Sequence, residues 1–96
     1  MRLANVAADG ATTRLIAAAQ ATLMTEGLPR ESAKTLVASA KGARLYMEAR
    51  ELGLAKQQID HIDKLMGTCE DQLLVKAYTR LTGDVRKALR WEEVHG

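Results

Sequence analysis

Apolar residues recur at three- and four-residue steps through most of this 96-residue chain, and that spacing constrains its fold more than any other feature. In residues 12–26 the apolar stripe consists of Leu15, Ile16, Ala19 and Leu23. The chain has one proline and no phenylalanine, and aromatic residues make up only 3% of it. Its core must therefore be built from alanine and aliphatic side chains. Since alanine and leucine are strong helix formers, we predict an all-α protein.

Glycine, proline and capping residues divide this pattern into segments. We expect helices over about 12–26, 29–52, 55–66, 69–81 and 84–93, with residues 1–9 as a loose N-terminal arm or a first helical turn. Gly42 interrupts the second segment, so residues 29–52 form either one long helix or two short ones. The predicted architecture is a compact bundle of five to six short helices, with residues 1–96 in a single domain.

Charge and cysteine content limit the classes of function. The chain has 14 basic and 12 acidic residues and a net charge of +2, which is lower than in many dedicated nucleic-acid-binding proteins. Cys69 is the only cysteine, so no intrachain disulfide can form. No apolar run reaches the roughly 20 residues that cross a membrane, and no signal-peptide pattern is present. We expect a cytoplasmic protein without a membrane partner.

Residues 45–65 carry the most specific pattern in the chain. Ala49, Gly53, Ile59 and Ile62 stand at the spacing of a small residue, a turn glycine and two core contacts. This spacing resembles the helix-turn-helix of phage-repressor-type DNA-binding proteins, whose second helix enters the major groove. The resemblance is confined to this stretch, and it implies a probe helix over about 55–66. An ordinary corner between two helices of a bundle is the alternative interpretation.

Carried over to this chain, the resemblance implies that five polar side chains lie on or near the groove-facing side: Lys56, Gln57, Gln58, Asp60 and His61. A glutamine there can recognise adenine, and Lys56 can contact phosphate or guanine. Helix-turn-helix proteins usually bind two half-sites as symmetric dimers. The implied partner is double-stranded DNA, bound by a homodimer.

A second candidate surface is a C-terminal basic face, which consists of Lys76, Arg80, Arg86, Lys87 and Arg90. Lys76 and Arg80 are four residues apart, as are Arg86 and Arg90, so each pair shares a helix face. Such a face can hold phosphates or an acidic protein patch, and a merely solvated surface is the simpler alternative. Trp91 follows directly, either as the anchor of an interface or as a residue that closes the core.

The sequence contains no convincing catalytic or metal-binding constellation. His61 and His95 are the only histidines, and no second histidine or cysteine stands at a metal-ligand spacing. We therefore predict no enzymatic activity, no metal and no cofactor. The leading hypothesis is a small DNA-binding regulator. The alternative is a protein-binding inhibitor or adaptor, such as a phage-encoded anti-CRISPR-like protein that docks on a nucleic-acid-handling complex.

Overall fold

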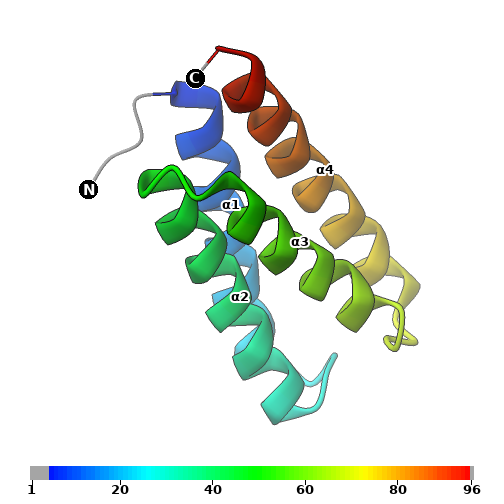
Figure 1. Ribbon diagram of the computed structural model, residues 1–96. Helices are drawn as coiled ribbons and strands as arrows, with labels where there is room; N and C mark the ends of the chain where they lie inside the picture. The colour runs from blue at the N-terminus through cyan, green and yellow to red at the C-terminus, as the bar shows by residue number, and fades with distance from the viewer. Residues whose placement is uncertain (1–4, 96) are drawn as a thin grey trace.

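The computed structural model describes residues 5–95, which form four α-helices in up-down-up-down order (Figure 1). They are α1 (Val6–Leu23), α2 (Arg30–Glu48), α3 (Leu52–Met66) and α4 (Gln72–His95). Each helix packs against its neighbours in the chain, and α1 also packs against α4, so the four surround one core. Within residues 5–95 there is no strand, and no helix is both long and apolar enough to cross a membrane. The all-α prediction is confirmed.

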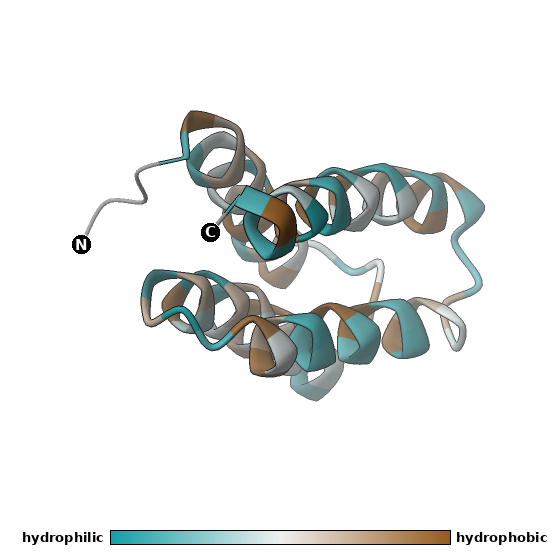
Figure 2. Cartoon of the chain, turned by 45° about the horizontal axis from the view of Figure 1, so that its top comes forward, coloured by the Kyte–Doolittle hydropathy of each residue, from teal (hydrophilic) through white to brown (hydrophobic). Residues whose placement is uncertain are grey.

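The core consists of alanine and aliphatic side chains, as the composition requires. Ile59 and Ile62, predicted as the inward contacts of the third helix, are completely buried, as are Leu15 and Leu36. Figure 2 shows apolar and polar residues alternating along the helices at short intervals, which is the pattern of helices that each bury one side. Tyr78 is also buried, and its hydroxyl lies 2.7 Å from the Thr22 hydroxyl, which links α4 to α1.

Two predicted breaks fall inside continuous helices, so the described chain has four helices instead of five or six. Gly42 lies within α2, so the segment predicted as either one long helix or two short ones forms one helix. Residues 82–84 lie within α4, which joins the predicted helices 69–81 and 84–93. Neither Gly42 nor Gly83 has a positive φ. A helical glycine costs only about 1 kcal/mol against alanine, and the packing of the flanking turns outweighs that cost.

The ends of α1 and α4 also differ from the prediction. Helix α1 begins at Val6 because the Asn5 side chain accepts hydrogen bonds from the amides of Ala7 and Ala8, so residues 6–9 are helical. Residues 1–4 of the predicted arm lie outside the described residues. Helix α1 ends at Leu23, before the predicted end at residue 26. At the start of α4, Asp71 Oδ1 accepts hydrogen bonds from two backbone amides, at 3.1 and 3.3 Å.

Candidate nucleic-acid interface

The turn between α2 and α3 lies at residues 49–51, not at Gly53. Arg50 takes a left-handed conformation, with φ of 62°. Its amide donates to Met47 O at 3.1 Å, and the Glu51 amide donates to Tyr46 O at 2.8 Å. These two bonds are the Schellman pattern that ends a helix with a left-handed residue. Gly53 therefore lies in the first turn of α3, and the prediction that it forms the corner is wrong.

Helices α2 and α3 run side by side in opposite directions (Figure 1). A helix-turn-helix instead sets its two helices at about 90–120°. Ala49 is exposed at the end of α2, while the buried alanines of this pair of helices are Ala33, Ala40, Ala43 and Ala55. The stretch 45–65 thus forms one end of a helical hairpin, and α3 lies flat against the bundle along its length.

The five side chains proposed to face DNA have different environments. Lys56, Gln57, Asp60 and His61 are exposed, whereas Gln58 is half-buried. The Gln58 side chain packs over Gly42 of α2. Lys56 points toward α4, where it borders a shallow hollow together with Arg86 and Arg90. The structure therefore brings Lys56 next to the predicted basic face, and it leaves Gln57 and His61 accessible on α3.

Arg86 does not contribute a free charge to the predicted basic face, because acidic side chains of α3 pair with it. Its Nη2 atom donates to Asp60 Oδ1 at 2.8 Å and to Asp63 Oδ2 at 2.5 Å, so it joins α4 to α3. The hydrogen bond with Asp63 raises the pKa of the Arg86 guanidinium, and the bond with Asp60 adds to this effect. The Thr82 hydroxyl also lies 2.9 Å from Asp63 Oδ1. Arg86 therefore stabilises the bundle, and its charge is already neutralised.

The other four members of the basic face lie on one side of α4. We call them the basic stripe: Lys76, Arg80, Lys87 and Arg90, all exposed. Steps of four, seven and three residues return to the same side of a helix with 3.6 residues per turn, and the stripe is about 21 Å long. None of the four pairs with an acidic side chain within residues 5–95. Because α4 is continuous, the predicted pair of Lys76 and Arg80 joins Lys87 and Arg90 in one linear array of four charges. Arg86, which was predicted to share a face with Arg90, is not part of this array.

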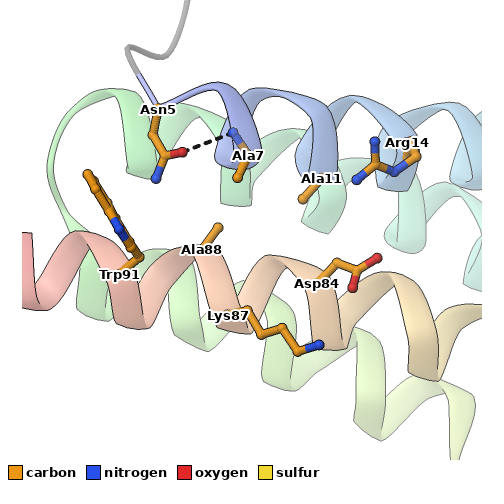
Figure 3. Close-up of a pocket in the computed structure, with 8 residues that line it drawn as sticks. All are labelled: Asn5, Ala7, Ala11, Arg14, Asp84, Lys87, Ala88 and Trp91. Atoms are coloured by element: carbon orange, nitrogen blue, oxygen red, sulfur yellow. Dashed lines mark hydrogen bonds between the residues drawn. The ribbon is translucent and has the colours of Figure 1, made fainter.

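Trp91 lies beside the basic stripe, in a groove between α1 and α4. The residue is 49% exposed, so it does not close the core. The His95 ring stacks on the indole, with ring centroids 4.3 Å apart and an interplanar angle of 16°. Figure 3 shows Trp91 at one end of the groove and Arg14 and Asp84 toward the other. The sequence singled out Trp91 but gave no sign of this groove, because the groove depends on the pairing of α1 with α4.

Five exposed apolar residues lie near the helix ends at one end of the bundle, where α1 and α3 begin and α2 and α4 end (Figure 1). We call this the apolar end; its members are Val6, Leu45, Leu54, Trp91 and Val94. Leu73 and Met24 are exposed at the opposite end. Cys69 is buried as a free thiol. In the described part of the chain no group of three or more histidine, cysteine or acidic residues is placed to hold a metal ion.

Comparison with known proteins gives no relative: no family model, no curated protein and no solved structure matches the chain. The function is therefore inferred from the geometry of this chain alone.

Proposed function

We propose that the protein is a small, non-enzymatic DNA-binding regulator that contacts the DNA backbone through the basic stripe of α4. The observation that carries the proposal is the array of four exposed cationic side chains, without acidic partners in the described chain, on one face of a single helix. Lysine and arginine side chains that neutralise phosphates release condensed counterions, which is the main source of sequence-independent affinity for nucleic acids. A stripe of about 21 Å is long enough to follow several phosphates.

Helix α3 adds polar groups beside the stripe. Lys56 borders the hollow that contains Arg90, and Gln57 and His61 are exposed on the same helix. Because α3 lies flat on the bundle, its side chains reach less far into a DNA groove than those of a protruding helix. Backbone contacts position a protein on DNA but do not specify a sequence. We therefore expect binding with weak sequence preference, in which Lys56 adds affinity and Gln57 adds little discrimination.

The proposal is tested by removing half of the stripe. The double variant Lys76→Ser/Arg80→Ser changes two exposed side chains and leaves the core intact. Its matched control is Arg30→Ser/Lys41→Ser, which removes the same charge from exposed positions on α2. Loss of two phosphate contacts should weaken binding to labelled DNA by about tenfold or more at low salt. Equal losses for both variants would show that net charge alone, and not the stripe, attracts DNA.

The apolar end favours a second candidate function, that of a protein-binding inhibitor or adaptor. Val6 is 81% exposed and Val94 is 78% exposed at this end of the bundle, and exposed apolar area is the kind of surface that a protein contact covers. On this hypothesis Leu45→Ser or Val94→Ser abolishes co-purification with one stoichiometric partner, while the basic-stripe variant retains it. The opposite pattern, or no partner at all, would show that the apolar end is not a protein-binding surface.

A further inference from the structure

We infer that the groove between α1 and α4 takes up an unpaired nucleobase on Trp91, so that the protein binds single-stranded nucleic acid in preference to a duplex. The inference rests on the proposed function, because the backbone of the same strand would follow the basic stripe of α4. It specifies that the preferred nucleic acid is single-stranded and that Trp91 is the residue that selects it.

Trp91 has the features of a stacking platform. His95 covers one face of the indole at 4.3 Å, and the His95 Nδ1 atom lies 2.9 Å from Trp91 O, so the two rings are held as a pair. Trp91 nevertheless remains 49% exposed and borders the groove. An aromatic ring that is fixed by its neighbour and open on its other side can accept a nucleobase of any type, because every base presents a flat π-face.

The groove has room for such a ring beside Trp91. Ala7 and Ala11 of α1 and Ala88 of α4 border it, and Figure 3 shows these small side chains between Trp91 and the charged residues farther along. Its volume is about 430 Å³. Sites for small organic ligands usually span about 300–1,000 Å³, so a nucleobase fits within this groove.

The charged side chains around the groove favour a position of the nucleic-acid backbone at its outer edge. Lys87 belongs to the basic stripe and also borders the groove, one helical turn before Trp91. Side chains four residues apart on a helix have Cβ atoms about 5–6 Å apart, so one nucleotide can reach both. Asp84 disfavours a phosphate deeper inside, which leaves Lys87 to hold a phosphate at the rim while the base points inward. Arg90 continues the basic stripe beside the groove, where it borders the hollow next to α3. Arg14 of α1 borders the same groove.

A duplex cannot use this site without disruption. Its bases are paired and stacked on one another, and an enzyme that needs access to a base must first extrude it at a cost in free energy. A single strand offers the same phosphates to the basic stripe, and it also offers unpaired bases to Trp91. Binding to a duplex is therefore expected through the stripe alone, and binding to a single strand through both surfaces.

The test compares Trp91→Ala with Trp91→Phe on a labelled single-stranded oligonucleotide and on the duplex of the same sequence. Trp91→Ala should weaken binding to the single strand by about tenfold and leave duplex binding unchanged, because stacking on one aromatic ring is lost. Trp91→Phe keeps a ring and should retain most of the affinity. Trp91 is the only tryptophan, so its fluorescence in the unaltered protein should be quenched by the single strand but not by the duplex.

Two further outcomes separate this inference from the proposed function. If Lys76→Ser/Arg80→Ser weakens binding to both forms while Trp91→Ala weakens neither and the fluorescence does not change, the stripe binds DNA and the inference about the groove is wrong. If neither form binds at low salt, the proposed function fails, and the inference fails with it.

Discussion

Replacing Gly83 with alanine should stabilise the protein, because Gly83 lies in the interior of α4. Its φ is not positive, and a Cβ at this position would meet no atom within 4 Å, so alanine adds neither strain nor overlap. Alanine is about 1 kcal/mol more favourable than glycine inside a helix, since glycine loses more backbone entropy on folding. For a domain of this size, a gain of 1 kcal/mol raises the melting temperature by about 4–8 °C.

The measurement is thermal and urea unfolding of the two proteins, followed by far-ultraviolet circular dichroism. Ala77→Gly is the matched control, because Ala77 is an exposed residue of the same helix and the reverse change should cost a similar free energy. A decrease in the free energy of unfolding for Gly83→Ala would show that the chain turns at residues 82–84. The basic stripe would then be divided between two helices, and the structural basis for DNA binding would be lost.

Three further substitutions test other parts of the structure. Gly53→Ala should raise the free energy of unfolding by about 0.5–1 kcal/mol in the same assay, because a Cβ there also meets nothing within 4 Å. A decrease in the free energy of unfolding would instead place the turn at Gly53, as in a helix-turn-helix. Tyr78→Phe should lower the free energy of unfolding by about 1 kcal/mol through loss of the hydrogen bond to Thr22. Burial raises the pKa of Tyr78 above its ordinary 10.0, so its contribution to stability is complete below pH 10 and is lost as the pH rises through the higher folded-state pKa. Alkaline unfolding curves that are identical for the original protein and Tyr78→Phe would contradict this. Arg86→Met should lower the free energy of unfolding by about 0.5–1 kcal/mol but change DNA affinity little. Lys87→Met should weaken DNA binding but change the free energy of unfolding little. Equal losses of DNA affinity in the two variants would refute this division of roles.

The helical class and the buried faces could be predicted from the sequence, because they depend on local spacing. Ile59 and Ile62 are buried where the three-residue step between them predicts. Helix ends were less predictable, since a glycine favours a break only weakly. Gly42 and Gly83 each lie between strongly helical turns that pack on the core, and the helices continue through them. The left-handed turn residue is Arg50, a residue type that does not favour that conformation, so the sequence offers no signal for it.

The candidate site was harder to predict than the helices, because it depends on contacts between residues that are far apart in the sequence. Lys76 and Arg80 could be assigned to one face by their spacing, but joining them to Lys87 and Arg90 required α4 to be continuous. The role of Arg86 could not be predicted, because Asp60 and Asp63 reach it from another helix. The same holds for the groove beside Trp91, whose second wall comes from α1.

The most direct test of the central claim is the salt dependence of DNA binding. The logarithm of the binding constant, plotted against the logarithm of salt concentration, falls with a slope of about −0.9 per phosphate neutralised on duplex DNA. Four side chains in the basic stripe therefore predict a slope of about −3 to −4 for the unaltered protein. In Lys76→Ser/Arg80→Ser the slope should fall to about half of that value. An unchanged slope in this variant, or no binding to DNA at low salt, would contradict the proposal that α4 is the DNA-binding surface.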